Sequence, residues 1–365
     1  MPAQLPERWE AGSEFHFRSW PPPKCPNEHP WKTRGQLYGS GRDALVSLLK
    51  YGVVELKWQR LWIPSFFCQE VAQILISTRI EVLAYHANPL RLDDGFEEAK
   101  QLRSNDVVLT LNFFGLQRRL MRPETDHNQV VIIEDHTHDP WSQCSWQSDA
   151  DWCVASLRKT LPIPDGGVLW SPKEHLMPSL PAVSAMRSLA SMKKFVAMAL
   201  KHLYLEGHRV TKEVFRSLAV AGESEIASGE VSAITPWSAE LIDSSPISEW
   251  RELRRQNHQA ISTALVTAMG VRVIQPEAET GGVPFAAFLV FDTAKRQAFV
   301  RQNLIVSGVY PAVHWPLENP TVTGIPEGDV ELSSRVLTLH CDFRYGPHDI
   351  ARIAELVVAM SRIVT

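Results

Sequence analysis

Between about residues 36 and 170 the chain alternates short apolar runs with segments whose apolar residues recur at helical spacing. The runs VVLTL (107–111) and VVII (130–133) are almost entirely apolar and are bounded by polar residues. Strands buried on both faces of a parallel sheet have this composition. Segments such as ALVSLLKYG (44–52), which suit an amphipathic helix, separate the runs. The alternation therefore predicts an α/β fold with a mostly parallel sheet between helices.

We expect three parts along the 365-residue chain. The first 35 residues are rich in proline and aromatic residues and lack periodicity, so we interpret them as an arm that lies on the body or on a partner subunit. Residues 36–245 contain the alternating segments and a mainly helical stretch, and they predict a large domain. The helices and strand-like segments of residues 246–365 predict a smaller α+β domain.

Composition and charge exclude several classes of function and site. The formal net charge is −4, which provides no basic surface for nucleic acid. The first residues lack the basic-then-apolar order of a secretory signal, and no uncharged stretch is long enough to cross a bilayer. Five cysteines are scattered without a CxxC pair, so we expect neither a disulfide framework nor a zinc cluster, and we expect a cytoplasmic protein.

The turn in YGSGRDAL (38–45) precedes one of the predicted helices. Its glycines leave backbone N–H groups accessible, and the helix dipole adds partial positive charge, so such a turn can bind an anion. Ser40, Gly41 and Arg42 are therefore candidate phosphate ligands. The alternative is an ordinary helix cap with an arginine that faces solvent.

The segment VVIIEDHTHD (130–139) ends in titratable side chains. Asp135 follows an apolar strand, where a carboxylate is unfavourable unless a cation or a hydrogen-bond donor faces it. A protonated ring nitrogen would be such a partner, and a cap of the next loop is the alternative. A metal site of His136, His138 and Asp139 is a third interpretation. No other cluster with metal-ligand spacing supports it, so we predict no metal.

The segment SLRKTLPIPDGG (156–167) places Lys159 between an apolar strand and a Gly-Gly turn. A lysine that attacks a carbonyl must be neutral, and burial beside a cation such as Arg158 lowers its pKa. Ser156 could hold an anionic group next to the lysine, and the glycines would let the backbone approach a flat ligand. A surface lysine in a proline-rich turn would not explain this combination.

Three further candidate residues lie at or just beyond predicted strand ends. Phe67, in PSFFC, could stack on a flat ligand or belong to the core. His314, in YPAVHWP, and Arg344, in LHCDFRYG, could contact a substrate or pack inside the second domain.

The order of these motifs resembles that of the fold-type I pyridoxal 5′-phosphate (PLP) enzymes, and in particular that of the DegT-type sugar aminotransferases. In that family a Glu-Asp pair ends a strand and the PLP-binding lysine lies seven residues before a Gly-Gly pair, as Lys159 lies before Gly166. The other matching segments are LWIPSFFCQEVAQIL, LNFFG, GVYPAVHWPLENP and RVLTLHCDFRYGPHDIARIAELV. The resemblance runs from about residue 35 to the end, with a weak middle. It implies a large domain with a mostly parallel seven-stranded sheet and a smaller α+β C-terminal domain.

The resemblance also implies an activity and a cofactor. A PLP-dependent aminotransferase would move an amino group from an amino acid such as glutamate to a keto-sugar or a related small keto compound. Lys159 would form the Schiff base with PLP and move the proton, and Asp135 would pair with the pyridinium nitrogen. Related enzymes are homodimers with shared active sites, so we expect a homodimer.

The remaining expected contacts follow from the same resemblance. They concern the PLP phosphate, ring hydroxyl and ring face, and then the substrate. The residues are, in that order, Ser40, Gly41, Arg42 and Ser156 for the phosphate, His138 for the hydroxyl, Phe67 for the ring face, and His314 and Arg344 for the substrate.

The chain departs from the family pattern in three places. His138 stands where the family has Gln, Ser156 lies three rather than five residues before the lysine, and the usual N-y-R-M stretch has no counterpart after residue 175. The alternative functions are a PLP-dependent dehydratase or other lyase, a non-catalytic binding protein with the PLP-enzyme fold, and a metal hydrolase. Retention of Lys159 favours transamination, because the related dehydratases replace that lysine.

Overall fold

The computed structural model describes residues 8–17, 31, 34–91, 96–117, 120, 123, 130–277 and 281–363. Within these residues the largest sheet has seven strands in the order β2-β8-β7-β6-β5-β3-β4. Their bounds are β2 (Gly35–Tyr38), β3 (Arg60–Pro64), β4 (Glu81–Tyr85), β5 (Asp106–Leu111), β6 (Val131–Asp135), β7 (Trp152–Ala155) and β8 (Gly167–Trp170). Strands β4, β3, β5, β6 and β7 pair in parallel, and β8 pairs antiparallel with both β7 and β2. The expected mostly parallel α/β sheet is confirmed.

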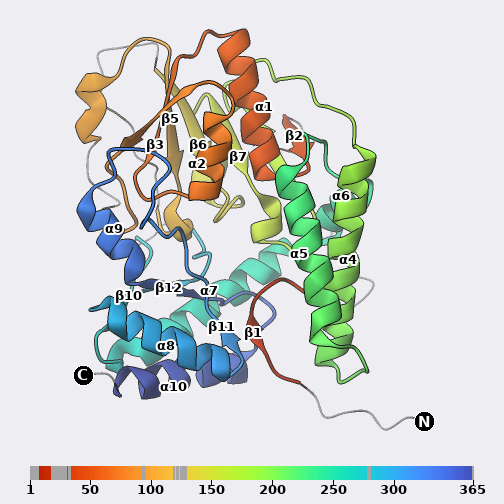
Figure 1. Ribbon diagram of the computed structural model, residues 1–365, viewed down its shortest axis with the longest axis vertical. Coiled ribbons are helices and arrows are strands. Elements are labelled where there is room, and N and C mark those ends of the chain that lie inside the picture. The colour runs from red at the N-terminus through yellow and green to blue at the C-terminus, as the bar shows by residue number, and fades with distance from the viewer. Residues whose placement is uncertain are drawn as a thin grey trace.

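Helices pack on both faces of this sheet because the strands are apolar on both sides (Figure 1). Helices α1 (Gly41–Val54) and α2 (Gln69–Ile76) share one apolar core with Val154 and Leu169. The alternate side chains of the same strands, Cys153 and Ala155 among them, belong to a second core. Side chains of α4 (Ala185–Leu205), α6 (Pro236–Ser244) and α7 (Ile247–Ala264) complete that core.

A second, antiparallel sheet lies in the C-terminal part, with the order β12-β10-β9. Its strands are β9 (Val271–Val273), β10 (Ala287–Phe291) and β12 (Val336–Leu339). The neighbouring helices are α8 (Ala294–Val306), α9 (Glu327–Ser334) and α10 (Pro347–Ser361). The short β1 (Ala11–Gly12) pairs in parallel with β11 (Val309–Tyr310). The chain near its N-terminus thus joins the C-terminal part, whereas the proline-rich stretch 20–30 of the predicted arm lies outside the described residues.

Helices α4 and α5 (Lys212–Ser228) form an antiparallel pair that runs beside both sheets in Figure 1. Side chains of both helices, Met198 and Ala219 among them, line a cavity together with His314 and Arg344. The remaining short helix, α3 (Gln143–Trp146), follows β6. No helix of the described residues combines the length and the apolar character needed to cross a membrane.

Candidate active site

The carboxyl ends of β3, β6 and β7 meet at one edge of the large sheet, because these strands run in the same direction. Two neighbouring cavities lie there, a small one of about 140 Å³ and a large one of about 750 Å³. The small cavity is lined by nine of the ten residues predicted for the site, namely Ser40, Gly41, Arg42, Phe67, Asp135, His138, Ser156, Lys159 and His314. The tenth, Arg344, lines the large cavity. Arg42, Lys159 and His314 line both.

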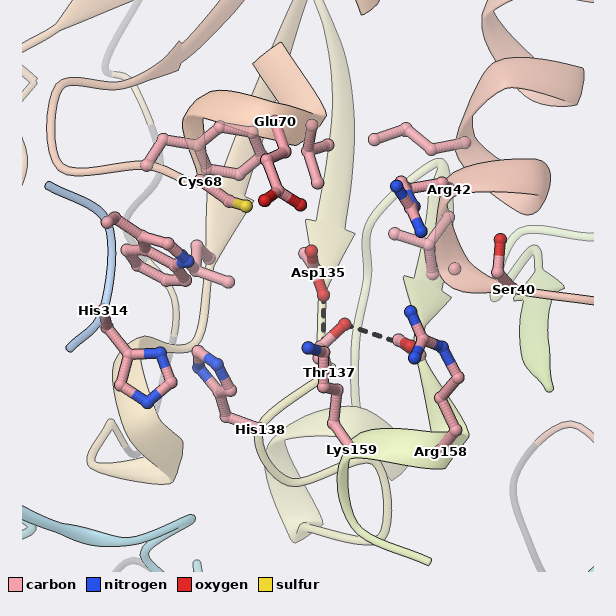
Figure 2. Close-up of a pocket in the computed structure, with 18 of the residues that line it drawn as sticks. Ser40, Arg42, Cys68, Glu70, Asp135, Thr137, His138, Arg158, Lys159 and His314 are labelled. Carbon is pink, nitrogen blue, oxygen red and sulfur yellow. Dashed lines mark hydrogen bonds between the residues drawn. The ribbon is translucent and has the colours of Figure 1, made fainter. Parts of the chain in front are cut away.

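Asp135 is the last residue of β6 and faces the small cavity (Figure 2). Its Oδ1 accepts the backbone N–H of Thr137 at 2.8 Å. Burial raises the pKa of Asp135, although the hydrogen bonds from Thr137 oppose the shift. A buried carboxylate that faces a cavity is suited to a cationic N–H partner from a ligand.

Lys159 ends the short 3-10 helix Leu157–Lys159 that follows β7. The side chain lies deep in the protein, yet it faces the cavity, so that solvent can reach it. Burial lowers the pKa of Lys159, and the neighbouring Arg158 lowers it further. The setting expected from the sequence, a lysine beside a cation, is therefore present, and it favours the neutral amine.

The turn before α1 and the end of β7 form a narrow cradle for an anion. A Cβ on Gly41 would lie 2.9 Å from the Cβ of Ser156, so only glycine leaves room there. The Oγ of Ser40 accepts the N–H of Asp43 at 3.1 Å, which leaves its hydroxyl hydrogen free to donate. Together with the N-terminal end of α1, these groups fit a phosphate.

Basic side chains extend the positive charge of the cradle along the cavity wall. Arg158 makes two hydrogen bonds of 2.6 and 2.7 Å to Glu223 on α5. Lys194 contacts the same carboxylate at 2.5 Å, and Arg42 lies 3.5 Å from it. Glu223 thus organises three cations, whose combined charge attracts an anion to this end of the cavity.

Aromatic rings form the opposite wall of the small cavity. The Nδ1 of His138 lies 3.0 Å from the backbone nitrogen of Phe114 and 3.2 Å from the carbonyl oxygen of Asn112. Burial lowers the pKa of His138 to about 3, so its ring is neutral. Phe67 and Cys68, which are adjacent in sequence, both line the cavity. The Phe67 ring packs against Trp315 at a centroid distance of 6.2 Å.

The two predicted substrate residues have different surroundings. The Nε2 of His314 is buried without a hydrogen-bond partner, and burial holds the pKa of His314 well below its usual range. Arg344 makes a two-point ion pair with Asp342, at 2.7 and 2.9 Å, and its Nη1 donates to the carbonyl of Glu14 at 3.0 Å. His314 therefore has a free polar atom near the cavities, whereas much of the Arg344 guanidinium is already engaged.

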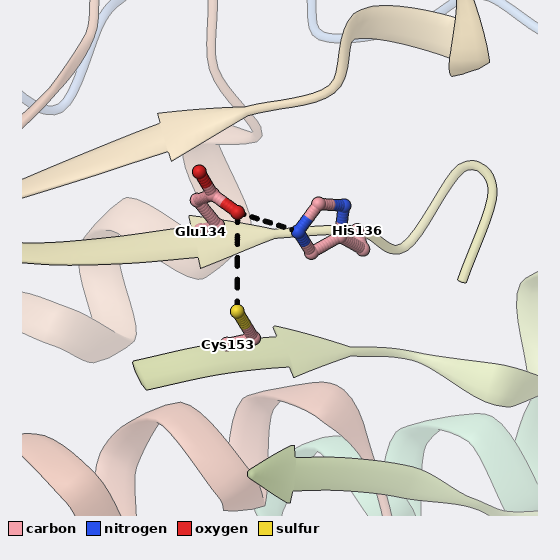
Figure 3. A group of neighbouring side chains, drawn as sticks. All are labelled: Glu134, His136 and Cys153. Carbon is pink, nitrogen blue, oxygen red and sulfur yellow. Dashed lines mark hydrogen bonds and ion pairs between the residues drawn. The ribbon is translucent and has the colours of Figure 1, made fainter. Parts of the chain in front are cut away.

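The metal alternative rested on His136, His138 and Asp139, which serve different purposes in the structure. Asp139 pairs with Arg251 at 2.9 Å, and His138 bonds the backbone of Phe114. His136 is not among the residues that line the two cavities, and it donates Nε2–H to Glu134 at 2.8 Å (Figure 3). We interpret this buried group, which includes Cys153, as a hydrogen-bonded part of the core.

Two residues that the sequence did not single out contribute to the site. Thr137 joins Asp135 to Ser156, since its N–H donates to the former and its hydroxyl accepts the N–H of the latter at 3.0 Å. Its position in the chain between Asp135 and His138 was the signal from which the sequence could have indicated that Thr137 belongs to the site. Glu223 lies 65 residues beyond Arg158 in a helix without a motif, so no local signal indicated it.

No known protein-family model matches this chain, and no curated protein matches its sequence. Solved structures do match its fold. The aminotransferase TlmJ from Streptoalloteichus hindustanus is 16% identical with a TM-score of 0.57, over 90% of this chain and 86% of its own. The chain has the fold of a type I PLP enzyme.

Two further structures share this fold. The 3-amino-5-hydroxybenzoic acid synthase is 13% identical with a TM-score of 0.60, over 91% of this chain and 87% of its own. Spr1654 from Streptococcus pneumoniae, a sugar aminotransferase by its description, is 11% identical in its PLP form with a TM-score of 0.58, over 95% of this chain and 94% of its own. The expected fold class is confirmed by these likenesses.

Proposed function

We propose that the chain is a PLP-dependent aminotransferase with Lys159 as its cofactor-binding lysine. It would transfer an amino group from an amino acid such as glutamate to a keto-sugar or a related small keto compound. The observation that carries the proposal is the convergence of Lys159 and Asp135 on one cavity beside the anion cradle of Gly41. An amine, a carboxylate and a phosphate site are the three contacts that a PLP ring needs.

The residues of the small cavity fit the parts of PLP. Ser40, Gly41, Arg42 and Ser156 would hold the phosphate, Asp135 the ring nitrogen, His138 the ring hydroxyl and Phe67 a ring face. A bound PLP supplies an aldehyde that reacts with amines and a ring that withdraws electrons from the substrate. The neutral ring of His138 carries one N–H, which could donate to a ring oxygen.

Lys159 and Asp135 have complementary tasks in this proposal. The lowered pKa of Lys159 favours the neutral amine, which can bond to a carbonyl carbon and later carry a proton at Nζ. Asp135, whose pKa is raised by burial, would gain a cationic partner in a protonated ring nitrogen. Thr137 holds the Asp135 carboxylate in place through its backbone N–H.

The names of the structural neighbours support the same assignment. Spr1654 has been solved in a PLP form and in a PMP form, and DesI in the presence of its TDP-sugar product. The keto-sugar acceptor that we propose agrees with these descriptions. His314 and Arg344 are the proposed substrate contacts, because they line the large cavity next to Lys159.

We also propose a homodimer that works in the cytoplasm. Met186, Leu189, Met192 and Val196 on α4 are exposed and follow helical spacing along one face. A second copy of the chain could cover this face. Light scattering would then report a dimer for the wild type and a smaller mass for a Leu189→Glu variant.

The cofactor assignment is tested with Lys159→Ala. The wild-type protein purified with PLP should show the absorbance of lysine-bound PLP, and borohydride should fix a pyridoxyl group on the peptide that contains Lys159. The variant should lose the absorbance, the label and turnover. Lys173→Ala is the control, because Lys173 is a half-exposed lysine paired with Asp151. Retention of absorbance and turnover by Lys159→Ala would refute the proposal.

A further inference from the structure

Lys201 is a buried lysine of α4 that lines the large cavity. Its Nζ donates to the backbone carbonyls of Glu14, at 2.6 Å, and Gly12, at 3.4 Å. Among the described residues, no carboxylate oxygen lies within ion-pair distance of this nitrogen. Two of its three N–H groups are thus engaged, and one remains for a ligand.

An ammonium group in this position is unfavourable for the folded chain. Burial, together with the positive charge of Arg344, lowers the pKa of Lys201 to about 7. Two carbonyl oxygens compensate a buried charge less well than a carboxylate does. A methionine of similar length would occupy the same space without this penalty, so the lysine needs an explanation beyond packing.

The charges around Lys201 leave room for one more anion. Arg344 donates to the same Glu14 carbonyl, but Asp342 already neutralises its guanidinium. Lys201, Arg254 and Arg344 line this end of the cavity together with the carboxylates of Glu14 and Asp342. Positive groups therefore exceed negative groups by one among these five residues. Among the described residues neither Lys201 nor Arg254 forms an ion pair with a carboxylate, and Arg254 donates to the carbonyl of Thr160 at 3.2 Å.

We propose that Lys201, assisted by Arg344, binds the carboxylate of a substrate in the large cavity. The inference rests on the proposed function, and it assigns Lys201 to the carboxylate of the amino-acid donor. Lys159 lines the same cavity, so a ligand that occupies this cavity can lie beside both lysines. The carboxylate would take the remaining N–H of Lys201 and supply the missing negative charge.

Binding of a dicarboxylate probe tests this role directly. Calorimetry with PLP-loaded wild-type protein should show binding of glutarate and much weaker binding of glutaramide, which has the same chain without charge. Lys201→Met should weaken glutarate binding about 10- to 100-fold, the effect of one lost charge-assisted hydrogen bond. The control is Lys193→Met, which removes a lysine of the same helix that pairs with Glu225.

Proton uptake on binding distinguishes a Lys201 that contacts the ligand from a Lys201 that only holds the segment 12–14. Because Lys201 titrates near pH 7 in the free protein, a bound carboxylate should make it take up a proton. Glutarate affinity should therefore fall between pH 7 and 9 in the wild type and fall less in Lys201→Met. The charged groups that face Lys201 are Arg344, Glu14, Glu10 and Lys212.

The nearby histidines do not titrate in this range. Burial lowers the pKa of His16 to about 2 and that of His340 to about 4, so both are neutral above pH 6. Lys194 lines the same cavity, and burial lowers its pKa to about 8. The part of the proton uptake between pH 7 and 9 that is lost in Lys201→Met, read from heats in buffers of different ionisation enthalpy, therefore reports on Lys201.

The outcomes are distinct from those of the cofactor test. A wild type that ignores glutarate, or a Lys201→Met variant that binds it as tightly as the wild type, overturns this proposal even when Lys159 carries PLP. Equal losses for glutarate and glutaramide would assign Lys201 to holding the segment 12–14 and also overturn it. Failure of PLP to label Lys159 would instead refute the proposed function, because glutarate binding is measured without the reaction.

Discussion

Gly41 and Ser156 approach so closely that a Cβ at position 41 would lie 2.9 Å from the Cβ of Ser156. Residue 41 begins α1 and residue 156 follows β7, so this contact closes the cradle proposed for the cofactor phosphate. Gly41→Ala should push the two segments apart and weaken PLP binding by at least about tenfold, the effect of one lost hydrogen bond to a charged group. Equilibrium dialysis of PLP measures the change.

The control for this substitution is Gly328→Ala in α9. A Cβ at position 328 meets no atom within 4 Å, so the variant should bind PLP as the wild type does. Unphosphorylated pyridoxal provides a second comparison, because its affinity should change little in Gly41→Ala. An equal loss for pyridoxal and PLP would contradict the assignment of this turn to the phosphate.

Asp135 is expected to act on the cofactor ring rather than on the fold. Asp135→Asn keeps the size of the side chain and removes its charge, so a ring nitrogen would lose the partner that keeps it protonated. Turnover should fall by about a hundredfold or more, which is typical when an electrostatic contact to the reacting group is removed. The borohydride label on Lys159 should remain, and mass spectrometry would detect it.

Asp151→Asn is the matched control for Asp135→Asn. Asp151 accepts the N–H of Ile132 at 2.8 Å, near the opposite end of the same strands. Its substitution should leave both turnover and the cofactor absorbance unchanged. If Asp135→Asn turns over as fast as this control, Asp135 has no part in the chemistry.

Lys159, Asp135 and the turn at Gly41 could be predicted because each has a local signal. Apolar runs mark the strands, and the carboxyl ends of parallel strands meet at one edge of a sheet. Polar residues or glycines directly after such runs therefore come together, as they do around the small cavity. The sheet itself follows from the same runs.

Contacts between distant segments had no such signal. The Glu14 carbonyl receives hydrogen bonds from Lys201 and Arg344, which lie 187 and 330 residues away. Lys201 occupies an ordinary helical segment, and Arg344 alone appeared as a candidate because it follows an apolar strand. A backbone carbonyl is available at every residue, so only the three-dimensional fold selects the one that these cations use.

Glu223 should stabilise the protein in a pH-dependent way. The Arg158 charge holds the pKa of Glu223 far below its usual range, so its contribution is present above the unfolded-state pKa near 4.5 and is lost as the pH falls toward the lower folded value. Glu223→Gln should lower the stability by about 1 kcal/mol at pH 7, since the carboxylate is partly exposed and solvent screens it. Urea titrations at pH 7 and pH 3 would show the difference shrink.

The pair Lys193–Glu225 is the comparison for Glu223, because it also joins α4 to α5. Glu225→Gln should destabilise the protein less than Glu223→Gln, since Glu225 has one cationic partner among the ion pairs of the described residues and Glu223 has three. Equal effects of the two substitutions would show that the cation cluster adds no special stability.

Asp329 on α9 is expected to hold that helix against the large sheet. It is 1% exposed, accepts Nδ2–H of Asn88 at 2.7 Å, and also accepts the hydroxyl of Ser65, which follows β3. Asp329→Ala would leave these buried donors without an acceptor and should reduce the free energy of unfolding by about 2–4 kcal/mol.

Urea denaturation at pH 7 measures this loss. Asp329→Asn retains one acceptor oxygen and should cause a smaller loss than Asp329→Ala, which separates the hydrogen bonds from simple loss of volume. Because Ser65 lies two residues before Phe67 in the wall of the small cavity, Asp329→Ala should also loosen PLP binding. A variant as stable as the wild type would mean that α9 is held by its apolar contacts alone.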